Sequence, residues 1–109
     1  MNGQKRIRDY GIVIGNMTPG ERNSITDVAG VRVGHITLDE GDIKTGVTAI
    51  IPHEGDMFKE KLVASSHVIN GFGKSAGLVQ IEELGTLETP IIYLAKASHA
   101  VPTLNVLVN

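Results

Sequence analysis

The chain has 109 residues, of which 41% are hydrophobic and 20% charged, so it is long enough for one small domain and apolar enough to bury a core. A formal net charge of −2 and scattered Lys and Arg residues argue against a nucleic-acid or anionic-membrane partner. The absence of cysteine excludes disulfides and thiolate chemistry, and no apolar run approaches the ~20 residues of a membrane span. The N-terminus lacks the apolar core of a signal peptide, so we expect a soluble, cytoplasmic protein.

Two β-strands are expected in the first half of the chain. Residues 31–38 alternate apolar and polar side chains with a period of two, and the alternation slips at Gly34, which is consistent with a β-bulge there. Residues 45–52 predict a second strand, which ends at a proline. The acidic segment 39–42 between them is typical of a hairpin turn.

The second half of the chain is less regular. Residues 53–61 are polar and loop-like, and residues 62–70 are a candidate for a third strand. Residues 75–81 fit either a strand or a helix. Residues 90–95 predict a buried strand, whereas 103–108, which follow a proline, favour the opening of a helix.

The sequence carries no strong catalytic or metal-binding motif. Its four histidines are far apart and form neither an HxH nor an HExxH pattern, so nothing in their spacing supports a metal site. For His35 and His67, each in a candidate strand, a hydrogen-bonded structural role is favoured. Gly73-Lys-Ser75 matches only the end of the phosphate-binding pattern GxxxxGK[ST], whose first glycine position holds Val68. No serine lies in a GxSxG elbow. We therefore assign no catalytic residue in this chain.

Two adjacent carboxylates, Glu82 and Glu83, interrupt an otherwise apolar run. On an extended segment, neighbouring side chains point to opposite faces, so one carboxylate would face the packed side. Such a carboxylate is costly unless it is hydrogen-bonded or paired with a cation, for example arginine or a free α-amino group. On this pattern alone, an exposed loop before Gly85 is the simpler interpretation.

Four long phrases of the sequence carry a family resemblance. They are ITDVAGVRVGH (25–35), KTGVTAIIP (44–52), HVINGFGKSAGL (67–78) and QIEELGTLETPI (80–91). In this order they closely resemble the N-terminal part of a self-cleaving aminopeptidase family, which includes L-aminopeptidase/D-amidase-esterase and the β-peptidyl aminopeptidases. The resemblance runs from Arg8 to at least Leu94.

The resemblance implies an α/β fold in which this chain is the N-terminal portion of a four-layer αββα sandwich, mostly β-strands. Residues 1–109 would then be a single segment of an incomplete domain. The family precursor cuts itself into an α and a β chain, and the new N-terminal serine of the β chain is the nucleophile. The resemblance implies no cofactor and no metal. The nucleophile would lie outside this chain, so the chain alone is expected to be inactive.

The resemblance also implies a substrate and site residues. Family substrates are peptides, amides or esters with a free N-terminal amine, attacked through an acyl-enzyme. Glu82 or Glu83 resembles an anchor for the protonated amine, and Asn70 resembles a second polar contributor to the pocket, although a turn residue before Gly71 explains Asn70 equally well. Residues 95–99 depart from the family's Asn and Thr residues, so no site residue is placed there. Expected partners are the remainder of the α chain, the β chain and further copies in a homo-oligomer.

Two alternatives remain open at this point. One is a non-catalytic binding or assembly module, or a remnant, in which the segment only makes subunit contacts and folds alone. The other is an acetyltransferase of the related ornithine acetyltransferase fold, with a threonine nucleophile. The phrase around Glu82 and Glu83 favours the aminopeptidase, by resemblance only.

Overall fold

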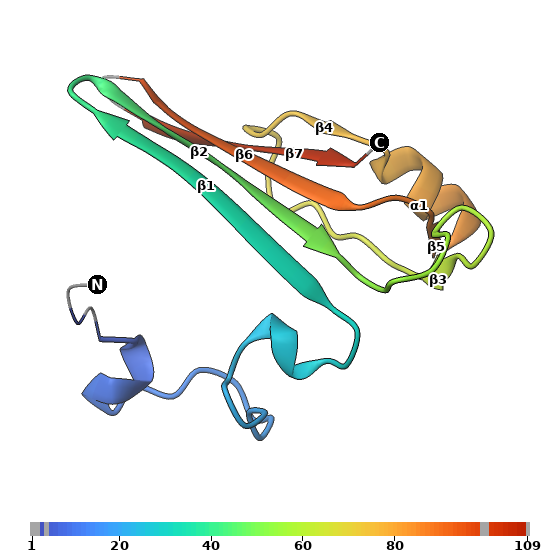
Figure 1. The fold of residues 1–109 in the computed structure, drawn as a ribbon, viewed down its shortest axis with the longest axis horizontal. Coiled ribbons are helices and arrows are strands. Elements are labelled where there is room, and N and C mark those ends of the chain that lie inside the picture. Colours follow the sequence, from blue (N-terminus) through green and yellow to red (C-terminus); the bar gives the residue numbers. More distant parts are fainter. Residues whose placement is uncertain (1–2, 4, 99–100, 109) are drawn as a thin grey trace.

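The computed structural model describes residues 3, 5–98 and 101–108 (Figure 1). Its elements in chain order are the 3-10 helices η1 (Ile7–Tyr10) and η2 (Ile25–Asp27), strands β1 (Arg32–Glu40), β2 (Ile43–Ile51), β3 (Leu62–Val63) and β4 (Ser75–Ala76), helix α1 (Leu78–Leu84), and strands β5 (Thr86–Leu87), β6 (Ile91–Ser98) and β7 (Val101–Val108). A five-stranded sheet has the order β1-β2-β6-β7-β4, and a second sheet pairs β3 with β5. The long strands β1, β2, β6 and β7 run side by side, and α1 lies near one end of them, beside β3 and β5 (Figure 1).

The hairpin of β1 and β2 confirms both strands expected in the first half of the chain, and each strand extends two residues further towards the turn. The two strands pair in continuous antiparallel register down to Glu40 opposite Ile43. Only Gly41 and Asp42 remain for the turn, which is therefore tighter than the predicted segment 39–42. Gly41 has a φ of +53°, a backbone conformation that glycine adopts without a steric penalty.

The bulge expected at Gly34 is absent, because Gly34 pairs with Ala49 without a break in the register. The apparent slip in the sequence pattern arises because the apolar residues lie on both faces of β1. Val33 points to one face, and Ile36 and Leu38 share the other with the side-chain-less Gly34. Apolar residues on both faces of the strand therefore look, in the sequence, like a slip in the period-two alternation.

The predicted strand at 90–95 is confirmed as part of β6, which pairs antiparallel with β2 on one side and with β7 on the other. The prediction of a helix at 103–108 is wrong, since these residues belong to strand β7. The segment is rich in Val and Leu, and the ladders to β6 and to the parallel strand β4 use its backbone groups. Tertiary pairing therefore overrides the helix-start signal of the proline.

The strand expected at 62–70 is reduced to the two residues of β3. Leu62 and Val63 pair with β5, and the remaining residues, 64–70, follow an irregular path. The ambiguous segment 75–81 divides at Gly77, which has a φ of +83°. The residues before it form β4, and those after it begin α1.

The buried core of the described residues is small and lies under α1. It consists of Met57, Ile81 and Leu87, with Ala64 and Ile91 packed against it. No helix among the described residues is both long and apolar enough to cross a bilayer.

Candidate functional site

Glu82 and Glu83 lie in the C-terminal half of α1, which corrects both the extended-segment and the loop interpretations. The segment LVQIEEL is composed largely of good helix formers. Gly85, with a φ of +65°, ends the helix, and its N–H donates to the carbonyl oxygen of Ile81 at 2.8 Å. A helix of seven residues is too short to display a clear helical period, so the sequence pattern could not distinguish it from a strand.

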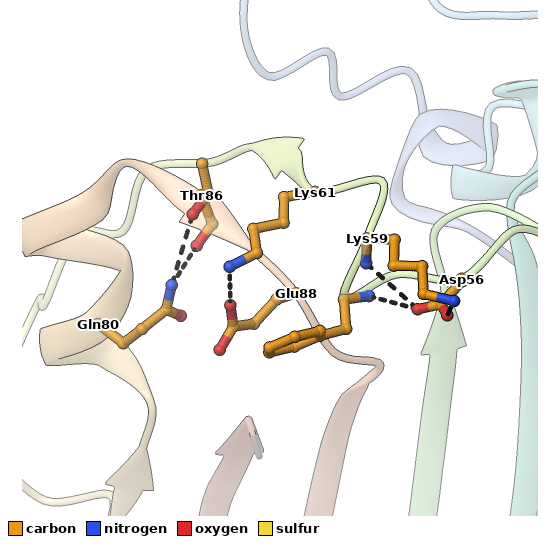
Figure 2. Close-up of polar contacts among 7 residues, drawn as sticks. Asp56, Lys59, Lys61, Gln80, Thr86 and Glu88 are labelled. Atoms are coloured by element: carbon orange, nitrogen blue, oxygen red, sulfur yellow. Dashed lines mark hydrogen bonds and ion pairs between the residues drawn. The ribbon is translucent and has the colours of Figure 1, made fainter.

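The helix that carries the two glutamates is fixed to the small β3–β5 sheet. Figure 2 shows Gln80 reaching towards Thr86, whose carbonyl oxygen accepts a hydrogen bond from Gln80 Nε2 at 3.0 Å. Gly85 in turn accepts a hydrogen bond from the N–H of Ala64 at 2.9 Å. The buried side chain of Ile81 packs into the core beneath. Both glutamates are therefore presented by an anchored element.

A third carboxylate near this helix is already engaged. Glu88 forms an ion pair with Lys61, with a distance of 2.7 Å from Oε2 to Nζ, and the two side chains are partly buried (Figure 2). Lys61 Nζ also lies 4.7 Å from the centre of the Phe58 ring, within cation–π range. Glu88 is thus compensated, unlike the two glutamates of α1.

Glu82 and Glu83 are exposed, and within the described residues neither forms an ion pair or a hydrogen bond. They lie next to the C-terminal end of α1, where the helix dipole is negative. Neither carboxylate is buried as an inward-facing anchor would be.

Asn70 lies in the irregular segment between β3 and β4, and its side chain is exposed. Its Oδ1 accepts a hydrogen bond from the N–H of Phe72 at 3.1 Å, the geometry of an Asx turn. No hydrogen bond among the described residues joins Asn70 to Glu82 or Glu83. The structure therefore supports the turn role of Asn70 and does not bring it together with the glutamates.

Two of the histidines make hydrogen bonds within their local structure. His35 Nδ1 lies 2.9 Å from Thr48 Oγ1 across the hairpin. His53 accepts a hydrogen bond from the N–H of Gly55 at Nδ1, and its Nε2 lies 2.9 Å from the carbonyl oxygen of Glu60. His99 lies outside the described residues. Within the described part of the chain, no three His, Asp or Glu side chains are grouped closely enough to share a metal ion.

Comparison with known proteins places the chain in a family of peptidases. The family described as peptidase family S58 matches residues 23–107, and the chain belongs to this family. The resemblance seen in the sequence is thereby confirmed.

Two curated relatives carry the same name. A β-peptidyl aminopeptidase BapA from Sphingosinicella xenopeptidilytica is 41% identical over 79% of this chain and 23% of its own length. A second BapA, from Sphingosinicella microcystinivorans, is 35% identical over 80% of this chain and 24% of its own length. The chain thus spans about a quarter of the length of the curated relatives that it matches.

A solved structure shares the fold. The crystal structure of the PH0078 protein from Pyrococcus horikoshii OT3 matches 94% of this chain and 38% of its own chain, with a TM-score of 0.74 and 39% sequence identity. This match, together with the antiparallel sheet and the helix α1, confirms the predicted α/β class and is consistent with a segment of a sandwich.

Proposed function

We propose that this chain is the N-terminal segment of a self-processing serine aminopeptidase. The observation that carries the proposal is the match of residues 23–107 to peptidase family S58. Relatives that are 41% and 35% identical bear the name of an aminopeptidase, which supports this activity within the family. The substrate would be a peptide or a related amide or ester with a free N-terminal amine.

The chemistry of the whole protein would follow the N-terminal nucleophile pattern. A serine hydroxyl at a newly exposed N-terminus attacks the amide carbonyl, and its own α-amine accepts the hydroxyl proton. The tetrahedral intermediate expels the leaving amine, which takes up that proton, and water then hydrolyses the acyl-enzyme. The nucleophile would then lie outside this chain, which spans about a quarter of the length of its curated relatives.

The contribution proposed for the present chain is recognition of the substrate's amine by Glu82 or Glu83. Both carboxylates are exposed, lie near the negative end of α1, and lack a partner among the described residues. A protonated amine would form a charge-assisted hydrogen bond with either carboxylate. The hydrogen bonds that fix α1 to β3 and β5 support this role, because an anchor must hold its position.

The first test is the intact mass of the protein as its natural gene produces it, before and after incubation. The proposal expects two chains, the second beginning with serine, and hydrolysis of amino-acid amides that is far faster than that of their N-acetylated forms. A second chain beginning with threonine would favour the acetyltransferase alternative. A single species of 11.6 kDa, the mass of this chain, would replace the enzyme proposal with a remnant or a binding module.

A further inference from the structure

Strand β1 forms one end of the five-stranded sheet, and within the described residues nothing pairs with its outer side. The strand is nine residues long, and all but one of its residues are exposed. Ile36 and Leu38 retain 70% and 49% of their accessible surface. Figure 1 shows the N-terminal segment running apart from the sheet, so the described residues leave this edge uncovered. A long and partly apolar edge is a template for pairing with another strand.

The hairpin register determines which backbone groups this edge offers. Because the turn has two residues, Glu40 and Ile43 are the hydrogen-bonded pair that closes it. Backbone direction alternates along the strand, so every second residue directs its N–H and C=O away from β2. These residues are Val33, His35, Thr37 and Asp39. Their groups form a row of donors and acceptors along the outer side of β1, which no strand among the described residues uses.

The sequence of β1 is complementary to itself when read in the opposite direction. In an antiparallel pair of β1 strands centred on Ile36, Arg32 lies opposite Glu40 of the second copy. Gly34 then lies opposite Leu38, and Ile36 lies opposite Ile36. We propose that a second copy of this chain docks on the free edge of β1, with the two β1 strands antiparallel and related by a two-fold axis at Ile36. The two sheets would become one continuous sheet.

The charges favour this register over the two registers whose axis is moved by two residues. Moving the axis by two residues to Leu38 places Glu40 opposite the apolar Ile36 and leaves Arg32 without a residue of β1 opposite it. Moving the axis to Gly34 places Arg32 opposite Ile36 and leaves Glu40 without a residue of β1 opposite it. The axis at Ile36 pairs all nine residues and opposes unlike charges at both ends, which favours it electrostatically.

The two-fold axis is perpendicular to the sheet, so the same faces of both copies meet. Ile36 and Leu38 lie on the face that also carries Val47 of β2, opposite Ile36 in the hairpin. Pairing two copies would therefore extend one apolar face across the junction. Arg32 and Glu40 form no ion pair within the described residues and are both exposed, so both are available to the second copy.

Charge reversal tests the proposal on the protein as its natural gene produces it. Arg32→Glu or Glu40→Arg alone would oppose like charges at two symmetric positions, and each should raise the dissociation constant of the β1 contact roughly tenfold. The double variant Arg32→Glu/Glu40→Arg again places opposite charges across from each other, so its dissociation constant should be close to that of the unmodified protein. Sedimentation velocity over a dilution series measures this, with Glu21→Arg, an exposed charge away from the sheet, as the matched control.

A cross-link provides a second readout that depends on the register. The residue pair at the axis does not exchange hydrogen bonds, so its two Cα atoms should lie about 4.5 Å apart, within reach of a disulfide. The chain has no cysteine, so Ile36→Cys introduces one thiol per copy. Oxidised glutathione, reduced to two thiols as the disulfide forms, should link Ile36→Cys copies quantitatively. Leu38→Cys on the same face would place its thiols roughly 13 Å apart and should stay unlinked.

Each contrary result overturns the proposal. If other residues of the same gene product cover β1, the unmodified protein will show no contact that responds to either charge reversal, and Ile36→Cys will not cross-link. If copies associate through a different surface, the single variants will keep the unmodified dissociation constant. A double variant that fails to recover would mean that Arg32 and Glu40 do not face each other.

Discussion

A Cβ atom on Gly46 would lie 2.9 Å from the backbone carbonyl oxygen of Ile36 in the neighbouring strand. The two residues belong to β2 and β1, adjacent strands of the hairpin. A carbonyl oxygen in a hydrogen-bonded ladder cannot move aside as a flexible side chain can. The close approach of these two backbones therefore requires glycine at position 46.

We expect Gly46→Ala to lower the free energy of unfolding by about 1–3 kcal/mol, the usual cost of overpacking. Gly34 in the facing strand offers a matched control, because a Cβ there meets nothing within 4 Å. Gly34→Ala should be neutral or stabilising by up to ~1 kcal/mol, since alanine loses less backbone entropy on folding. Urea denaturation of the intact gene product measures both changes. Equal effects of the two substitutions would contradict the steric argument.

The ion pair between Lys61 and Glu88 should contribute little more than a surface pair. The two side chains retain 36% and 24% of their accessible surface, so water still screens their attraction. A double-mutant cycle with Lys61→Met and Glu88→Gln is expected to give a coupling energy of about 0.5–1 kcal/mol. The exposed pair of Lys59 and Asp56, at 3.4 Å, is the control and should couple less. A larger coupling energy in the control pair would show that distance and burial do not determine which ion pair is stronger.

The strands that show alternation or a continuous apolar run could be predicted from the sequence. The hairpin of β1 and β2 shows alternation and a polar turn, and the apolar run of β6 is recognisable by composition alone. The strand β7 could not be predicted in this way, because β6 and β4 decide its conformation. The prediction of a strand over residues 62–70 was too long for a related reason, because only Leu62 and Val63 find a strand to pair with.

The residues proposed for the candidate site were chosen from the sequence, whereas their geometry could not be predicted from it. The unusual pair of carboxylates drew attention to Glu82 and Glu83, whereas their place on a helix depends on glycines at both ends and on the core beneath. Asn70 illustrates the opposite case, because its local turn was readable from Asn-Gly but its proposed place in a pocket required distant parts of the chain. The hydrogen bond between Gln80 and Thr86 carried no signal in the sequence.

The neutral ring of His53 should hold a single tautomer in the folded protein. Its Nδ1 accepts a hydrogen bond from the N–H of Gly55, which leaves Nε2 to carry the proton and donate to the carbonyl oxygen of Glu60. The ¹⁵N chemical shifts of the neutral imidazole should therefore show a protonated Nε2 and an unprotonated Nδ1. A ring averaging between the two tautomers would contradict the observed hydrogen bonds.

A substitution at Gly55 tests the packing of the turn that contains His53. A Cβ at this position would lie 3.1 Å from His53 Nδ1 and 2.5 Å from a carboxylate oxygen of Glu60. The Glu60 side chain is flexible and exposed, so it can move aside, whereas the ring of His53 is held by two hydrogen bonds. Gly55→Ala should therefore lower stability by roughly 1 kcal/mol, and Gly55→Ala/Glu60→Ala should recover little of this loss. Full recovery in the double variant would place the clash at Glu60 instead of His53.

Removing the charge of Glu82 or Glu83 should weaken recognition of the substrate's amine in the intact enzyme. Glu→Gln keeps the shape of the side chain but replaces a charge-assisted hydrogen bond with a neutral one, so kcat/KM for amine-bearing amides should fall roughly 10- to 100-fold at the responsible position. If the contact is made equally in the ground state and the transition state, KM will carry the loss and kcat will stay unchanged.

Two controls separate this effect from a general loss of structure. Glu21→Gln removes an exposed carboxylate away from α1 and should leave the kinetics unchanged. The residual turnover of N-acetylated amides, which lack the cationic amine, should also stay constant in Glu82→Gln and Glu83→Gln. Unchanged kinetics with amine-bearing substrates in both variants would reject the amine-anchor proposal, while self-cleavage into two chains would still support the aminopeptidase proposal.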